Sequence, residues 1–124
     1  YLDQGAAAWN RSPCLDVRIV DTCPEGTNCV TVSLTPGDDA DGNFDSVEEG
    51  DFTVGGHIDL FSEELDQLGE GAKLNVTIHE MGHAIGLRHR QTERVLMNPD
   101  TYTDIFDPDE TDFHNLRVLY GNQD

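Results

Sequence analysis

Two histidines, His79 and His83, lie four residues apart in this chain, with Glu80 directly after the first. On an α-helix, side chains at this spacing project from one face, one turn apart, so both imidazoles can bind the same metal ion. Gly86 is expected to end the helix, because glycine readily adopts the left-handed conformation that is common after a last helical turn. The chain can then turn back and bring His89 to the same ion. Three histidine ligands and one open position are typical of a catalytic zinc site.

The residues around these histidines support a helix. Apolar residues recur at helical spacing, at Leu74, Ile78, Met81 and Ile85. One face of the helix is therefore expected to enter the core while the histidines flank it. An alternative interpretation is a buried helix whose histidines make hydrogen bonds in the core. We favour the metal site because the complete HExxHxxGxxH pattern is much rarer than HExxH alone, and every required position is filled.

The composition predicts one acidic domain. The chain has 124 residues, which favours a single domain with a modest core, and no apolar run has the length of a membrane span. The formal net charge is -18, from 25 acidic and 7 basic residues. This charge excludes nucleic acid as a partner, because phosphate binding needs clustered cations. Two interpretations of the acidity stay open: a well-solvated surface, or a salt-rich habitat in which ions screen the repulsion between surface charges.

The chain contains three cysteines, Cys14, Cys23 and Cys29, and none belongs to a CxxC pair that would indicate a structural zinc site. Cys23 and Cys29 flank a short loop that can close as a disulfide in an oxidising compartment. A bond between Cys14 and Cys29 is the rival pairing. Three unpaired cysteines in a cytosolic protein are the third alternative.

Local patterns predict helices and strands in a mixed order. We expect helices at 2–10, after the loop at 68–71 and at about 109–120, strands at 16–20 and 30–34, and shorter strands at 52–54 and 57–61. Residues 62–64 are expected to begin a turn or short helix, and residues 90–101 to form a loop.

Residues 37–51 are rich in Asp, Glu and Gly, and oxygen donors at this density are what calcium prefers. The candidate calcium ligands are Asp39, Asp41, Asp45 and Asp59. The spacing is not that of an EF-hand, because Phe44 stands where its invariant glycine belongs and Gly50 where its closing glutamate belongs. A solvated acidic loop is the alternative interpretation.

The stretch from His79 to His89 resembles the zinc signature of the metzincin metalloproteases. Met97 lies eight residues after His89, within Leu-Met-Asn-Pro, and resembles the Met-turn beneath the zinc in that family. This spacing and the C-terminal Leu-Tyr-Gly at 119–121 are similar to matrixins. The short length and the segment 55–60 are closer to snapalysin-like small bacterial proteases. One departure is Arg90, which stands where matrixins have a serine.

The resemblance implies an α+β fold of the metzincin type. A twisted, mixed but mostly parallel sheet would carry an active-site helix and a C-terminal helix. We expect residues 1–124 to form one catalytic domain that lacks an N-terminal strand and a pro-segment.

The resemblance also implies a zinc-dependent endopeptidase. His79, His83 and His89 would hold Zn²⁺, Glu80 would act as general base, and Met97 would give the imidazoles an apolar floor. Two alternatives are a catalytically silent metal-binding or adhesion domain with the same fold, and a hydrolase of non-peptide amides.

The substrates implied are polypeptides, lying extended along the edge strand of the sheet. Pro99 and Tyr102 would form a wall of a side-chain pocket, with cleavage before a large apolar residue. We also expect a secreted monomer that binds no membrane, with a disulfide between Cys23 and Cys29.

Overall fold

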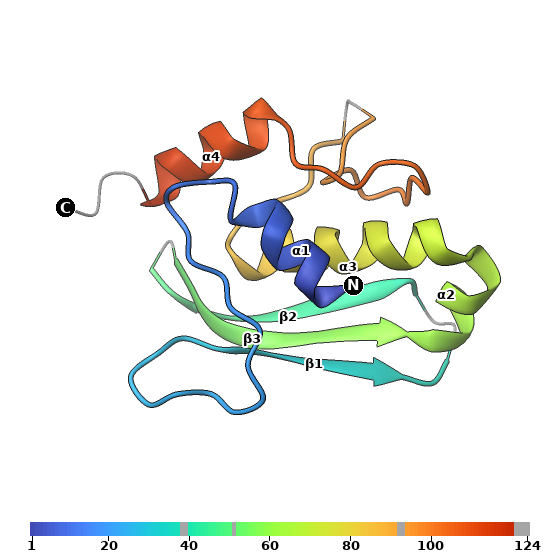
Figure 1. Cartoon of the computed structure of the whole chain (residues 1–124), viewed down its shortest axis with the longest axis horizontal. Coiled ribbons are helices and arrows are strands. Elements are labelled where there is room, and N and C mark those ends of the chain that lie inside the picture. Colours follow the sequence, from blue (N-terminus) through green and yellow to red (C-terminus); the bar gives the residue numbers. More distant parts are fainter. Residues whose placement is uncertain (38–39, 51, 92–93, 121–124) are drawn as a thin grey trace.

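The computed structural model describes residues 1–37, 40–50, 52–91 and 94–120. Its elements, in chain order, are α1 (Leu2–Trp9), β1 (Val30–Thr35), β2 (Gly42–Glu49), β3 (Phe52–Phe61), α2 (Ser62–Leu68), α3 (Glu70–Ala84) and α4 (Glu110–Tyr120). Helices α1, α3 and α4 lie on the same side of the sheet (Figure 1). The predicted α+β class, with a helix that carries the histidine motif and a C-terminal helix, is confirmed.

The sheet has the order β1-β3-β2. β1 runs parallel to β3, and β2 runs antiparallel to it, so one of the two pairings is parallel and the sheet is mixed. Within the part of the chain that the structure describes, β2 pairs with β3 alone. Its outer edge therefore has no strand partner there, which matters for the cleft described below.

β2 corrects one prediction, because the acidic stretch is a strand rather than a loop. Phe44 pairs with Ile58 of β3, which is buried, whereas Asp45 pairs with His57 on the opposite face of the sheet. Alternate residues of an acidic strand thus face the helices and the solvent. The acidic composition of this segment does not indicate which residues face the core. That becomes clear only from the pairing of β2 with β3.

β3 corrects a second prediction, because the short strands expected at 52–54 and 57–61 are one continuous strand. The glycines between the two expected strands do not interrupt β3; they allow the neighbouring strand β2 to approach it closely. Gly56 has φ 152°, and a Cβ there would lie 2.4 Å from the carbonyl oxygen of Asp45 and 2.6 Å from the ring of Phe44. β2 can therefore pack against β3 at this point.

The strand expected at 16–20 is absent, because this segment has no neighbouring strand in the described structure. The backbone of Val17 pairs instead with a side chain. The amide nitrogen of Asn10 donates to the Val17 carbonyl over 2.8 Å, and the Val17 N–H donates to the Asn10 amide oxygen over 2.7 Å. Ile19 and Val20 are exposed as a result.

The helix with the histidine motif begins and ends at glycines. α3 starts at Glu70, directly after Gly69, so most of the loop expected at 68–71 belongs to helices. Gly86 has φ 104°, and the Gly86 N–H donates to the carbonyl of His83 over 3.0 Å. The predicted helix stop at Gly86 is confirmed.

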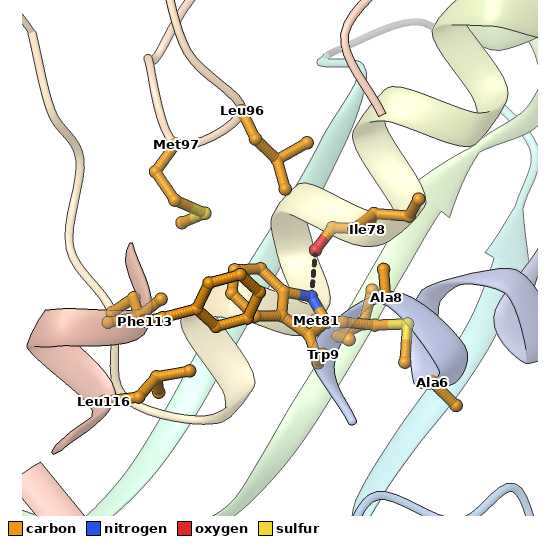
Figure 2. Packing of buried hydrophobic residues seen from close by; sticks show 11 residues of the cluster. Ala6, Ala8, Trp9, Ile78, Met81, Leu96, Met97, Phe113 and Leu116 are labelled. Atoms are coloured by element: carbon orange, nitrogen blue, oxygen red, sulfur yellow. Dashed lines mark hydrogen bonds between the residues drawn. The ribbon is translucent and has the colours of Figure 1, made fainter. Parts of the chain in front are cut away.

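The core lies between the sheet and the helices and is centred on Trp9, which is fully buried. Figure 2 shows Trp9 surrounded by apolar side chains from α1, α3, α4 and the segment at 96–97. Two glycines let these elements approach. A Cβ on Gly5 would lie 2.3 Å from the sulfur of Met81, and one on Gly82 would lie 2.8 Å from Cζ2 of Trp9.

Cys23 and Cys29 form a disulfide, and Cys14 is free and half-buried. The pairing favoured from the resemblance is therefore confirmed, and the pairing of Cys14 with Cys29 is excluded. Among the described residues, no helix is both long and apolar enough to cross a membrane.

Candidate metal centre

The three histidines of the motif converge on one point. His79 and His83 project from α3, and the turn at Gly86 brings His89 to them. The Nε2 atom of His79 lies 3.1 Å from Nε2 of His83 and 3.2 Å from Nε2 of His89. Among the described residues, this is the one group of three or more His, Cys, Asp or Glu side chains that could hold a metal ion.

The donor set fits zinc. In a tetrahedral site with zinc–nitrogen distances of about 2.0–2.1 Å, ligand nitrogens lie about 3.3 Å apart. The Nε2 atom of His79 lies 3.1 and 3.2 Å from those of His83 and His89, which is close to this value. Imidazole nitrogens are ordinary zinc ligands, and three of them leave a fourth position open.

Backbone carbonyls fix which nitrogen of each helical histidine faces the centre. Nδ1 of His79 lies 2.7 Å from the carbonyl oxygen of Leu96, and Nδ1 of His83 lies 2.7 Å from that of Leu87. A carbonyl only accepts, so each Nδ1 must carry the proton and donate it. Each Nε2 is then left with its lone pair toward the centre, as metal binding requires.

Burial keeps the two helical imidazoles neutral. It lowers the pKa of His79 to about 4, with a smaller contribution in the same direction from the neighbouring histidines. Burial also lowers the pKa of His83. The neutral imidazole is the form that binds a metal ion, so both residues are ready to act as ligands near neutral pH.

Glu80 lies beside this group and is almost fully buried. Burial raises its pKa to about 7, and the carboxylate of Asp41 acts in the same direction. The backbone of β2 lies directly against this part of α3, because a Cβ on Gly42 would lie 2.8 Å from Val76 and 3.1 Å from Cγ of Glu80. Gly42 thus sets the distance between the sheet edge and the histidine helix.

A cleft of about 750 Å³ opens next to the histidines. Residues of β2 from Gly42 to Glu48 line one side, and the turn from Gly86 to His89 lines the other, with Glu80 and His83 also in its lining. β2 is the outermost strand on this side of the sheet. An extended chain in the cleft would therefore meet a strand whose outer edge has no partner in the described structure.

Met97 packs against the histidine helix. It is fully buried, and its sulfur would lie 2.6 Å from a Cβ on Gly82, the residue before His83. Its carbonyl oxygen accepts a hydrogen bond of 2.9 Å from the backbone N–H of Arg90. The segment at 97 is thus fixed both to the histidine helix and to the turn that carries His89.

The residues of the predicted pocket wall, Pro99 and Tyr102, lie outside the lining of this cleft. Pro99 is exposed, and the ring of Tyr102 lies 4.8 Å from the guanidinium carbon of Arg94. Neither Pro99 nor Tyr102 lines the cleft beside the histidines. A separate pocket between α3 and this segment stays a prediction.

The candidate calcium ligands do not gather into a metal-binding group in the part of the chain that the structure describes. Asp41 accepts a hydrogen bond from the hydroxyl of Thr101. Asp59 accepts one of 2.9 Å from Thr35 and lies 3.0 Å from Nε2 of His57. Asp45 is on β2, across from His57, and Asp39 lies outside the described residues.

Several residues near the site were not predicted. Trp9 comes from a distant part of the sequence, and Arg90 contacts Asp109 and Asp112 at the start of α4. Their only sequence signals were a lone tryptophan at the end of a helix and an arginine where a serine was expected.

The sequence profile of the matrixin family matches residues 20–121. The matched span contains all three strands, α2, α3 and α4, together with the three histidines. No curated protein matches the chain.

Proposed function

Because the chain belongs to the matrixin family, we propose that it is a zinc-dependent endopeptidase. The observation that carries this proposal is the convergence of three imidazole Nε2 atoms at a cleft that Glu80, His83 and His89 line. His79, His83 and His89 would hold Zn²⁺, and Glu80 would be the catalytic acid–base group.

The ion, when bound, supplies Lewis-acid chemistry: it makes water more acidic and polarises the scissile carbonyl. Glu80 follows His79 directly and lines the same cleft as His83, so its carboxylate is within the space that the reacting water and peptide bond would share. Glu80 accepts a proton from the attacking water and then delivers it to the leaving amine nitrogen. Met97 supports the imidazoles from below and takes no part in the proton transfers.

The substrate is a polypeptide that binds in extended form. The outer edge of β2 can offer backbone N–H and C=O groups to it, while the turn from Gly86 to His89 forms the opposite wall. Backbone pairing of this kind depends little on the side chains of the substrate, so selectivity must come from a side-chain pocket. We place that pocket beside Pro99 and Tyr102 and expect cleavage before a large apolar residue.

We propose that the protein is secreted. The disulfide between Cys23 and Cys29 and the family both favour an extracellular protein. We also propose that the protein acts as a monomer. Calcium binding at the acidic candidates Asp39, Asp41, Asp45 and Asp59, or dependence on high salt, stays a prediction, which thermal melts with calcium, and separately with molar salt, would test.

Digestion of casein tests the proposed function. The protein loaded with zinc should cleave casein, lose this activity with a chelator and regain it when zinc is added back. Glu80→Gln should retain zinc and lose about 10²–10⁴-fold in activity, as is typical of a lost acid–base group. Glu63→Gln, at an exposed glutamate of α2, is the matched control and should stay fully active.

Two results would contradict the proposal. Substantial proteolysis by a folded, zinc-loaded Glu80→Gln variant would show that Glu80 is not the acid–base group. A zinc-loaded protein that binds casein-derived peptides without cleaving them would instead support a silent metal-binding domain.

A further inference from the structure

Arg90 follows His89 and is largely buried, with 15% of its side chain exposed. Its backbone N–H is bonded to the Met97 carbonyl, as described above. Its guanidinium Nη1 donates to Oδ1 of Asp109 over 2.6 Å and to Oδ1 of Asp112 over 3.1 Å. A buried arginine next to the third histidine is thus held by two carboxylates from another part of the chain.

The two carboxylates are themselves fixed. The Asp109 N–H donates to Oδ2 of Asp112 and the Asp112 N–H donates to Oδ1 of Asp109, each over 3.0 Å. This reciprocal pair fixes the first turn of α4 in the manner of a capping box. Phe113 and Leu116 of the same helix are buried in the core, so the anchor for Arg90 is part of the rigid body of the protein.

His89 needs such an anchor more than the other two histidines. His79 and His83 stand on α3, and each donates from Nδ1 to a backbone carbonyl. His89 lies beyond the end of the helix and its side chain is exposed, so it has neither the helix backbone nor the burial that holds the other two. Its orientation therefore depends on the backbone that carries it.

We propose that Arg90 is a positioning residue for the metal centre: its ion pairs with Asp109 and Asp112 hold the turn after α3 so that His89 stays directed at His79 and His83. This inference rests on the proposed function only in that the three histidines hold the metal. Residues that orient metal ligands typically contribute 10- to 100-fold to metal affinity. Arg90 acts through the backbone rather than through a bond to the imidazole.

The test is the rate at which the zinc-loaded protein releases zinc to an excess of chelator. Arg90→Gln removes the charge and should release zinc about 10-fold faster or more. Arg90→Lys keeps a charge and should restore part of the retention. Arg11→Gln is the matched control, because Arg11 also pairs with an aspartate just before α4, Asp107, but in an exposed ion pair that does not involve the turn after α3; zinc release by this variant should be unchanged.

Cobalt substitution gives a second readout. The visible absorption of Co²⁺ reports the geometry of its ligands, so Arg90→Gln should alter the spectrum while Arg11→Gln leaves it as in the wild type. A purely structural role would lower the melting temperature of the metal-free protein without changing either the release rate or the spectrum. That result would overturn the inference.

Arg90→Gln leaves Asp112 buried without its cation and can fail to fold. If Arg90→Gln does not fold, Asp109→Asn tests the inference in its place. It removes one of the two charges that pair with Arg90, at a half-exposed position, and keeps the Oδ1 that caps α4. Faster zinc release by this variant supports the inference, and wild-type release overturns it. A wild-type protein that binds no zinc would instead contradict the proposed function.

Discussion

The indole N–H of Trp9 donates a hydrogen bond of 2.9 Å to the carbonyl oxygen of Ile78, the residue directly before His79 (Figure 2). Both side chains are buried. The bond ties α1 to the histidine helix at the turn that carries the first ligand. The position of that turn is therefore set by a residue 69 positions earlier in the chain.

Trp9→Ala should lower the free energy of unfolding by about 3–5 kcal/mol, because it empties a large buried site and leaves a cavity. Denaturant unfolding of the metal-free protein measures this change. Val118→Ala, at a side chain of α4 that is 62% exposed, is the control and should change stability by less than about 0.5 kcal/mol. Equal effects of the two substitutions would contradict the central place of Trp9 in the core.

Gly82→Ala should destabilise the protein by about 1–3 kcal/mol through overpacking. The new methyl group would lie 2.6 Å from the sulfur of Met97 and 2.8 Å from Trp9. Met97→Ala makes room for it, so the double variant Gly82→Ala/Met97→Ala should be more stable than the sum of the two single effects predicts. Strictly additive effects in this double-mutant cycle would show that the two residues do not compete for space.

The features that could be predicted from the sequence are those that local pattern determines. The convergence of the histidines follows from a four-residue spacing and a glycine that ends the helix. α1, β1 and α4 follow in the same way from short runs of apolar residues and from breakers at their ends. Each of these features needs only neighbours within a few turns of the chain.

The features that could not be predicted depend on distant partners. β2 is acidic, and only its pairing with β3 turns its alternation into a strand with a buried side. The segment at 16–20 has a strand pattern but no neighbouring strand, so its backbone bonds to Asn10 instead. Arg90 meets carboxylates 19 and 22 residues further along the chain, which no local pattern indicates.

The ion pair at Arg90 should also make stability depend on pH. Burial tends to raise the pKa of Asp109, but its hydrogen bonds with Arg90 and Asp112 outweigh this and lower the pKa below the ordinary value. A carboxyl with a lowered folded-state pKa contributes stability above its unfolded-state pKa and loses it as the pH falls through the folded-state value. The contribution of Asp109 is therefore complete at neutral pH and is lost in acid.

Asp109→Asn removes this titration. The difference in unfolding free energy between wild type and Asp109→Asn, measured on metal-free protein, should be constant near neutral pH and shrink below about pH 4, the ordinary range of an aspartate. Thermal melts across pH 2–7 measure it. A difference that stays unchanged down to the lowest pH would show that Asp109 has no lowered pKa in the folded protein.

Zinc should stabilise the protein only through the three histidines at the helix and turn. A ligand that binds the folded state alone adds about 2.7 kcal/mol at 100 times its dissociation constant, so zinc should raise the melting temperature of the metal-free protein. His89→Ala removes one of three ligands and should abolish most of this rise. His57→Ala is the matched control: His57 contacts Thr31 and Asp59 on the face of the sheet opposite Ile58 and the helices, and the rise should persist. A zinc-dependent rise that survives His89→Ala and disappears with His57→Ala would place the metal on the sheet and contradict the assignment of the centre.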